Sequence, residues 1–359
     1  MSQVSFPDLA QRLGDAVTTV MDELRPRLVE SALSGDHGER ANTRHAGNFL
    51  SSYDLQAHDR YRQLITPLLP AGFIYASEEA DPEVIGNDPD PDLCVLVDPL
   101  DTSELAVRAL HGYTHVMVYS RALRRPVAAV VGDIYHHIQL YLAARHDDGS
   151  DRASLVTRDG DSRRLHPGSG ATELSEALVT NYLMRPAERF RPLARQDAIL
   201  DALSGLSPDG SRRGRIGVDF GSVSLCHVAA GFTDATVEFA KGFAFWDLAP
   251  GHYILHAAGG TVLTLTGEPL SLDHGLTSLA AITKAMTPRQ TFVAAASPQL
   301  ANQILRVLHA VLRTGRSAVI QMPLASVALG RLALAKLASK FDDAEDTRRR
   351  HMSASPGRR

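Results

Sequence analysis

The chain has 359 residues, of which 44% are hydrophobic and 22% are charged, and its formal net charge at pH 7 is −4. These values are ordinary for a globular protein of about two domains, and the small negative charge gives no basis for binding a nucleic-acid polymer. We expect no signal peptide, because no basic N-terminal segment precedes an apolar core, and no membrane segment, because no apolar run reaches about 18 residues. Cys94 and Cys226 both lie in apolar runs, so we predict reduced cysteines and a cytoplasmic protein.

The pattern of the first half predicts two helices followed by a series of strands. Apolar residues at helical spacing define the helices, and short apolar runs define the strands. In chain order we predict helices over 6–33 and 54–69, separated by a polar loop over 34–48, then strands over 73–76, 93–97, 114–120, 126–132 and 138–143, with a loop rich in Asp and Pro over 81–92.

The second half predicts an alternation of helices and strands, which favours a layered α/β or α+β architecture. In chain order we predict a strand over 177–181, a helix over 189–204, strands over 215–219 and 235–240 that flank a helix from Ser222 to Gly231, a helix from Asp247 to Ala258, a strand over 261–265, and helices over 298–313 and 324–340. The charged, glycine-containing stretch over 145–170 is the predicted boundary. It divides the chain into an N-terminal α+β metal-binding domain (1–150), a C-terminal α/β domain (151–314) and a C-terminal extension (315–359), a helix followed by a disordered tail.

Acidic residues follow apolar or tightly turned segments at four places: Asp54, Glu78-Glu79, Asp98-Pro99-Leu100-Asp101-Thr102-Ser103, and Asp247 after Phe245-Trp246. Carboxylates are the hard oxygen ligands that Mg²⁺ prefers. A helix that starts beside them offers backbone N–H groups to a phosphate. The pattern therefore predicts metal ligands beside a phosphate-binding helix start, although each acid can instead cap a helix or lie in a solvated loop.

In this order the motifs resemble the inositol monophosphatase-like superfamily, which includes inositol monophosphatases, fructose-1,6-bisphosphatases and 3′-phosphoadenosine-5′-phosphate phosphatases. The resemblance covers residues 6–314 and rests on the four acidic places together with Gly221-Ser222, Trp246-Asp247-Leu248-Ala249-Pro250-Gly251 and Gly259-Gly260. It implies an α+β fold, the layered α/β/α/β/α sandwich of sugar phosphatases, with two subdomains and the metal site between them.

The resemblance also implies roles for single residues. The implied metal ligands are Glu78, Asp98, the carbonyl of Leu100, Asp101 and Asp247. The implied catalytic residues, among which Asp54 and Ser103 orient the attacking water, are Asp54, Ser103 and Glu78. The implied phosphate-binding residues are Thr102 and Ser103, through their N–H groups, and the implied substrate contacts are Asp101, Ser222 and Glu238.

Several of these residues have a second interpretation. Ser222 is equally a helix N-cap, and Glu238 is equally an exposed strand residue. Lys241 or Arg108 meets a second phosphate or carboxylate, or stays a solvated charge. His136 and His137 are adjacent in a strand and point to opposite faces, and no Cys/His spacing suits a tetrahedral zinc site, so we expect no metal binding by histidines.

Thr102 stands where the superfamily motif has glycine. A β-branched residue is penalised there if the backbone requires a positive φ. The segment 104–113, which follows the motif, matches none of the named subfamilies, so we expect an unusual substrate.

The function that the resemblance implies is hydrolysis of a small phosphorylated polyol or sugar by direct attack of a metal-activated water. It also implies two or three Mg²⁺ ions, replaceable by Mn²⁺, inhibition by Li⁺ and a homodimer that takes a small phosphorylated metabolite as its partner. One alternative is a nucleotide 3′-phosphatase or nucleotide monophosphatase of the same superfamily. The others are a non-hydrolytic relative that binds a phosphorylated ligand and a structural scaffold that binds no metal.

Overall fold

The computed structural model describes residues 5–45, 47–168, 171–207, 209–211 and 213–318. The chain divides into two compact units, Met1–Leu308 and His309–Arg359, and the fold described below is that of the first. The predicted helix over 324–340 and the tail over 341–359 lie outside the described residues. The last described helix, α9, spans Pro298–Ala318.

The first sheet has the strand order β2-β1-β3-β4-β5-β6-β7-β8. Its strands are β1 (Phe73–Ser77), β2 (Ala80–Ile85), β3 (Leu93–Asp101), β4 (Tyr113–Ser120), β5 (Arg125–Asp133), β6 (Ile138–Arg145), β7 (Asp151–Thr157) and β8 (Ser162–Arg164). Only β1 and β3 pair in parallel among these described strands, and the other neighbours are antiparallel.

The second sheet has the strand order β10-β9-β11-β13-β12. Its strands are β9 (Leu178–Asn181), β10 (Arg215–Val218), β11 (Ala235–Phe243), β12 (Thr261–Leu263) and β13 (Gln290–Ala295). β9 pairs in parallel with β10 and with β11, whereas β13 pairs antiparallel with β11 and β12.

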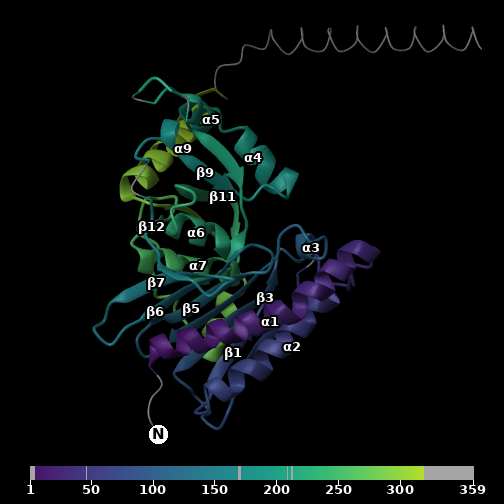
Figure 1. Ribbon diagram of the computed structural model, residues 1–359. Helices are drawn as coiled ribbons and strands as arrows, with labels where there is room; N and C mark the ends of the chain where they lie inside the picture. Colours follow the sequence, from purple (N-terminus) through teal and green to yellow (C-terminus); the bar gives the residue numbers. More distant parts are fainter. Residues whose placement is uncertain (1–4, 46, 169–170, 208, 212, 319–359) are drawn as a thin grey trace, which may run out of the picture. The chain divides into compact units, whose positions relative to one another are not determined.

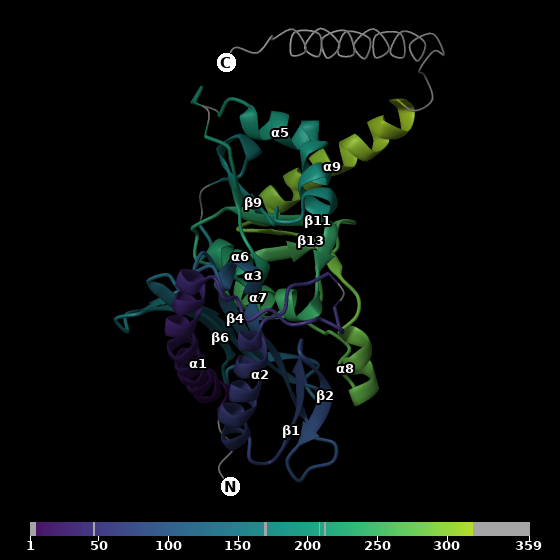
Figure 2. The same ribbon diagram turned by 90° about the vertical axis from the view of Figure 1, so that its right-hand side faces the viewer.

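Helices cover both sheets and separate them. They are α1 (Phe6–Ser34), α2 (Ser52–Ile65), α3 (Ser103–Ala106), α4 (Arg191–Ala194), α5 (Asp197–Ser204), α6 (Gly221–Ala229), α7 (Phe245–Ala258), α8 (Leu279–Ala285) and α9, with 3₁₀ turns η1 (Thr66–Leu68) and η2 (Leu174–Glu176) and a π turn η3 (Pro186–Phe190). α1 and α2 pack on the outer face of the first sheet, α6 and α7 lie between the two sheets, and α5 and α9 pack on the outer face of the second (Figures 1 and 2). This is the α/β/α/β/α layering that the sequence predicts.

Local signals in the sequence account for the long helix α1. The Ser5 side chain caps its start by accepting from the N–H of Asp8, and Gly35, at φ 74°, ends it in the left-handed conformation. Between these ends, apolar residues at helical spacing turn one face toward the sheet: Leu9, Leu13, Val17, Val20, Met21, Leu24 and Leu28 are all buried.

The structure corrects several predicted elements. The edge strand β2 (Ala80–Ile85) includes residues 81–85, predicted as loop, and Pro82 needs no ladder hydrogen bond at the edge. The predicted helix over 189–204 is divided into η3, α4 and α5, because the chain leaves helical geometry at Gln196 (φ −94°, ψ 62°). The sequence reading also missed α8 and β13, which are short.

The predicted boundary at 150 falls within the first sheet, since β7 and β8 extend that sheet to Arg164. The second sheet starts at Leu178, and both sheets lie within Met1–Leu308. The division into domains stays a prediction.

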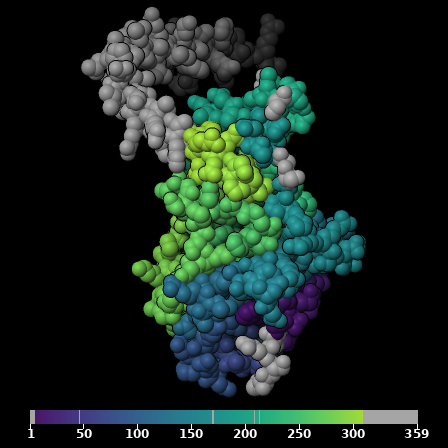
Figure 3. Space-filling view, turned by 90° about the vertical axis from the view of Figure 1, so that its left-hand side faces the viewer, coloured from purple at the N-terminus to yellow at the C-terminus, as the bar shows by residue number. Residues whose placement is uncertain are grey.

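Segments far apart in the sequence meet at the edge of the first sheet. α8 contacts the edge strand β2, and Figure 3 shows this green segment beside the blue strands. Within the described residues, no helix combines the length and the apolar character needed to cross a bilayer.

Candidate active site

A bulge in β3 brings two aspartates to one face of the first sheet. Asp98 pairs with His115 of β4 and Asp101 pairs with Tyr113, so the strand pairing shifts by one residue between Asp98 and Asp101. In a regular strand, residues three apart point to opposite faces, and the extra residue of a bulge reverses this. Pro99 lies in the bulge, a position that tolerates its missing N–H. Both carboxylates therefore face the layer between the two sheets.

Glu78 arrives at the same place from the neighbouring strand. β1 runs parallel to β3, with Ser77 opposite Val97, and the N–H of Glu78 donates to the carbonyl of Val97 at 3.2 Å. Because parallel strands end at the same edge of a sheet, Glu78 comes level with Asp98.

Two helix starts supply the remaining acids. Asp54 lies in the first turn of α2, where its Oδ2 accepts from the N–H (2.7 Å) and hydroxyl (2.6 Å) of Ser51. Asp247 lies in the first turn of α7, and its Oδ2 accepts from the N–H of Ala244 at 3.3 Å. The positive ends of the two helix dipoles favour carboxylates at these positions.

Burial and mutual repulsion raise the pKa values of these acids. Burial is the main cause for Glu78, whose pKa lies well above its usual value, and the charges of Asp247, Glu79, Asp54 and Asp101 add to it. The pKa of Asp98 is raised well above its usual value by burial and then by the charges of Glu78, Asp101 and Asp247. Burial and the charge of Asp247 likewise raise the pKa of Asp101 well above its usual value.

Burial raises the pKa of Asp247 too, although Arg289 and Arg189 oppose the shift. The pKa of Asp54 is raised by burial and held down by hydrogen bonds from Ser103 and Ser51. For all five acids the ionised form is therefore disfavoured unless a positive charge lies nearby.

The unpartnered oxygens fit a divalent cation. Asp98 is only 1% exposed, yet neither of its carboxylate oxygens receives a hydrogen bond from the described residues, and neither does Oδ2 of Asp101. Buried carboxylates normally have donors, and a bound cation would replace them. The predicted metal ligands Glu78, Asp98, Asp101 and Asp247 thus suit a bound divalent cation.

Ser103 connects the acids to the start of α3. Its hydroxyl lies 2.5 Å from Oδ1 of Asp54 and 2.8 Å from the carbonyl oxygen of Leu100. The serine has one hydroxyl proton, and the shorter contact is with Asp54. Asp54 and Ser103, predicted to act together, are therefore in direct contact.

Thr102 has a positive φ. Its backbone is left-handed, with φ 59° and ψ 38°, and its hydroxyl donates to the carbonyl of Asp101 at 2.6 Å. A non-glycine residue in this conformation costs about 1–2 kcal/mol. The turn geometry thus persists with threonine, and the predicted penalty applies. Thr102 and Ser103 both line the cavity described next, and their phosphate-binding role stays a prediction.

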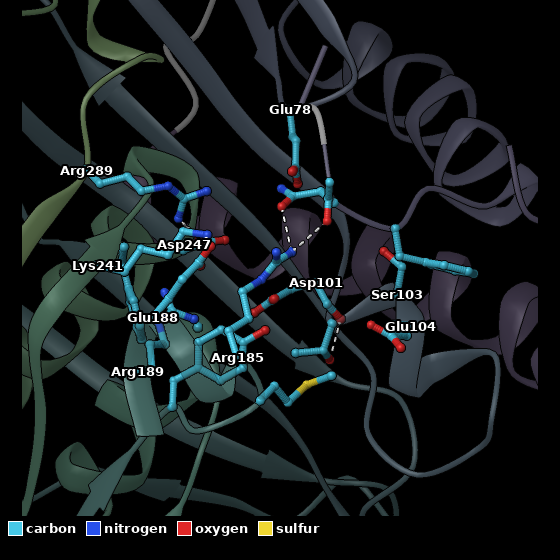
Figure 4. Close-up of a pocket in the computed structure, with 18 of the residues that line it drawn as sticks. Glu78, Asp101, Ser103, Glu104, Arg185, Glu188, Arg189, Lys241, Asp247 and Arg289 are labelled. Atoms are coloured by element: carbon cyan, nitrogen blue, oxygen red, sulfur yellow. Dashed lines mark hydrogen bonds and ion pairs between the residues drawn. The ribbon is translucent and has the colours of Figure 1, made fainter. Parts of the chain in front are cut away.

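A cavity of about 370 Å³ opens beside the acids. Figure 4 shows Glu78 and Ser103 on one side of it and Arg189, Lys241 and Arg289 on the opposite side. Acidic groups thus come mainly from the first half of the chain and basic groups from the second. The sequence reading considered Lys241 for an anion contact but missed Arg185, Arg189 and Arg289, since isolated arginines carry no motif signal.

Two predicted substrate contacts, Ser222 and Glu238, have partners within the protein, and their contact with a substrate stays a prediction. The Ser222 hydroxyl is buried, donates to the carbonyl of Asp247 at 2.7 Å and accepts from the N–H of Gly251 at 3.1 Å, so it joins α6 to α7. Glu238 is buried as well: Oε2 lies 2.9 Å from Nε of Arg189, and Oε1 accepts from the N–H groups at 240–242. Both side chains are used structurally, and neither lines the cavity.

The layered fold and the clustered acidic side chains define a protein with a candidate metal-binding site. Residues 8–313 match the model of the inositol monophosphatase family, and the chain belongs to that family.

A stretch of 108 residues is 35% identical to human inositol monophosphatase 2 and covers 29% of this chain and 34% of that protein, so the match spans about a third of the relative. A second relative, the bifunctional NADP phosphatase/NAD kinase of Methanococcus maripaludis, is 24% identical over 57% of this chain and 35% of its own length. The crystal structure of Mycobacterium tuberculosis SuhB shares the fold, with a TM-score of 0.59 at 20% identity over 86% of this chain and 98% of that one.

Repulsion among the acids should make metal-free stability depend on pH through Glu79, whose pKa is raised from 4.5 to about 7 by burial and the charge of Asp54. The folded state then holds a proton that the unfolded state has released. The stabilising contribution of Glu79 is complete below pH 4.5 and is lost as the pH rises through about 7. Thermal melting in EDTA at a series of pH values measures this. Tm should fall less steeply between pH 4.5 and about 7 for Glu79→Gln than for the wild type.

The exposed Glu268 provides the matched control. Tm of Glu268→Gln should fall with rising pH as steeply as Tm of the wild type. Added Mg²⁺ should raise Tm and flatten the wild-type curve, since a cation favours the ionised carboxylates. A Glu79→Gln curve that parallels the wild type in EDTA would refute the assignment.

In the variant Thr102→Gly, relief of backbone strain should offset the stability lost with the threonine side chain. Thr102→Gly removes about 1–2 kcal/mol of left-handed strain but adds about 0.5–1 kcal/mol of unfolded-state entropy. We expect an unfolding free energy equal to the wild type or up to about 1 kcal/mol higher, measured by urea denaturation. Thr66 is the control, because its hydroxyl also donates to a backbone carbonyl (2.7 Å) but its φ is −51°. Thr66→Gly should destabilise, and equal losses at both sites would contradict the prediction.

Proposed function

We propose that this protein is a Mg²⁺-dependent phosphomonoesterase that hydrolyses a small phosphorylated polyol or sugar. The main support is that Glu78, Asp101 and Asp247 line a cavity that also holds the start of α3. Beside them, neither oxygen of Asp98 has a hydrogen-bond donor among the described residues. Family membership of the chain supports the reaction class.

The residues on the cavity wall suit water activation. Ser51 binds Oδ2 of Asp54, so the carboxylate is fixed with Oδ1 toward Ser103. When the Ser103 hydroxyl donates to Asp54, its oxygen is free to accept a hydrogen bond from a water molecule in the cavity. Ser103 then orients that water. When the water loses a proton to the Ser103 oxygen, the hydroxyl proton of Ser103 moves to Asp54, which acts as the general base.

The carboxylates of Glu78, Asp98, Asp101 and Asp247, with the carbonyl of Leu100, would hold the cations. Bound Mg²⁺ would neutralise charge on the phosphoryl and leaving oxygens and make water easier to deprotonate. Inhibition by Li⁺, a homodimer and a cytoplasmic location stay predictions.

A second candidate substrate class carries a further anionic group, as nucleotides do. Arg185 lines the cavity, and its guanidinium donates to the uncharged oxygens of Asn48 (2.8 Å) and Gly47 (3.2 Å). Within the described residues it forms no ion pair, unlike Arg189 and Lys241, which pair with Glu238 and Glu188. Its charge is thus available to a second phosphate, and one relative is named an NADP phosphatase.

Release of inorganic phosphate from a panel of compounds tests the activity. The panel should contain inositol, glucose and fructose monophosphates, a sugar bisphosphate, the 2′-, 3′- and 5′-nucleotides and NADP, each with Mg²⁺ and with EDTA. Asp54→Asn should lower kcat about 10²- to 10⁴-fold with little change in KM, because Asn preserves the acceptor for Ser51 but takes no proton. The exposed Asp209→Asn is the control. Ligand binding without Mg²⁺-dependent release from any compound would favour the non-hydrolytic alternative.

Arg185→Ala separates the two substrate classes. If the substrate carries a second anionic group, the variant should raise KM for bisphosphates and nucleotides about tenfold, the effect of losing about 1.4 kcal/mol of binding. KM for polyol and sugar monophosphates should stay unchanged. Arg163→Ala, at an exposed position in β8, is the control. An equal rise for both classes would exclude selective recognition by Arg185.

A further inference from the structure

A buried histidine lies against the acids of the candidate metal site. His115 is directly opposite Asp98 in the pairing of β3 with β4, and Tyr113, two residues earlier, is opposite Asp101. Directly opposite residues share a face of the sheet, as do residues two apart. The bulge therefore places Asp98, Asp101 and His115 together on one face.

The three side chains are at a spacing that one ion can span. Nδ1 of His115 lies 3.7 Å from Oδ2 of Asp98, and Nε2 lies 3.4 Å from Oδ2 of Asp101. One ligand atom from each residue can be chosen so that all three lie within 4.8 Å of one another. Ligand atoms that share an ion at about 2.0–2.2 Å are separated by no more than this.

The imidazole is buried without a hydrogen-bond partner. The side chain is 0% exposed, and neither ring nitrogen makes a hydrogen bond of good geometry with the described residues. The facing oxygens of Asp98 and Asp101 also have none. Unpartnered buried polar atoms are rare, and a cation among the three side chains would provide a partner for one ring nitrogen and for the facing carboxylate oxygens.

A neutral imidazole offers one nitrogen lone pair to a metal ion and keeps an N–H on its other nitrogen. Histidine ligands usually place that N–H on a carboxylate or a backbone carbonyl, and the backbone of Trp246 lies beside the ring.

We propose that His115 is a nitrogen ligand of the metal centre, which therefore binds first-row transition ions such as Co²⁺ or Mn²⁺ more tightly than a site made of oxygens alone would. The proposal rests on the proposed function only in using the same carboxylates. Imidazole favours transition ions, whereas a site made of oxygens alone suits Mg²⁺. The competing role for His115 is purely structural: it would donate a hydrogen bond to Asp98 or Asp101 and leave the ion with oxygen ligands.

Pulsed electron paramagnetic resonance of bound Mn²⁺ distinguishes the two roles. Full-length protein without an affinity tag is stripped with EDTA and loaded with one equivalent of Mn²⁺. We expect the ¹⁴N coupling of a directly bound imidazole in the wild type and its loss in His115→Gln. The matched control is His252→Gln, since His252 is also a buried histidine but lies outside the group formed by Asp98, Asp101 and His115. This control should keep the coupling.

A second readout needs no variant and so does not depend on the folding of His115→Gln. Protein labelled with ¹⁵N only at histidine should replace the ¹⁴N coupling with a ¹⁵N coupling. In calorimetric titrations, His115→Gln should lower the preference for Mn²⁺ over Mg²⁺ about 10- to 100-fold, the range seen when groups supporting a metal site are removed.

The outcomes separate this proposal from the proposed function. Bound Mn²⁺ without nitrogen coupling in the wild type, or a coupling that survives histidine labelling unchanged, overturns the role of His115 and leaves the phosphatase proposal intact. A histidine coupling in a protein that releases no phosphate from any compound supports the ligand and overturns the phosphatase proposal.

Discussion

Electrostatic repulsion among buried carboxylates is the constraint on which this structure depends. Glu78, Asp98, Asp101 and Asp247 come from three segments of the chain. Burial raises the pKa of each, and neighbouring acids add to the shift for Glu78, Asp98 and Asp101, whereas Arg289 and Arg189 oppose it for Asp247. Such a cluster is unfavourable without positive charge, and the fold supplies little of it directly at Asp98, whose oxygens have no donors in the described residues. A divalent cation bound among these carboxylates would be attracted by their charges and would relieve the repulsion between them.

Backbone geometry brings the cluster together. The bulge in β3 turns Asp98 and Asp101 to one face, the parallel pairing of β1 with β3 aligns Glu78, and the first turn of α7 presents Asp247. Ser222 then joins α6 to α7 through the carbonyl of Asp247. The two sheets are thus connected at the site, because the layer between them carries one of its acids.

The basic side of the cavity bears on substrate choice, and His115 bears on the choice of ion. Arg189 is held in place by Glu238, whereas Arg185 lines the cavity and forms no ion pair among the described residues. His115 adds a nitrogen to a site otherwise made of oxygens. Both features lie outside the acidic motif, where members of one family can differ.

The order of the acidic motifs in the sequence alone indicated the family, and the layers and the candidate metal ligands followed from that resemblance. Apolar spacing defines α1, and the acids of the motif follow an apolar strand directly. Tertiary structure decided what depends on pairing across the fold: the edge strand β2, the partners that bury Ser222 and Glu238, and the arrival of Arg185 and His115 at the site. No spacing in the sequence reports these contacts, since strand register and the packing of distant segments bring together residues that carry no mutual signal along the chain.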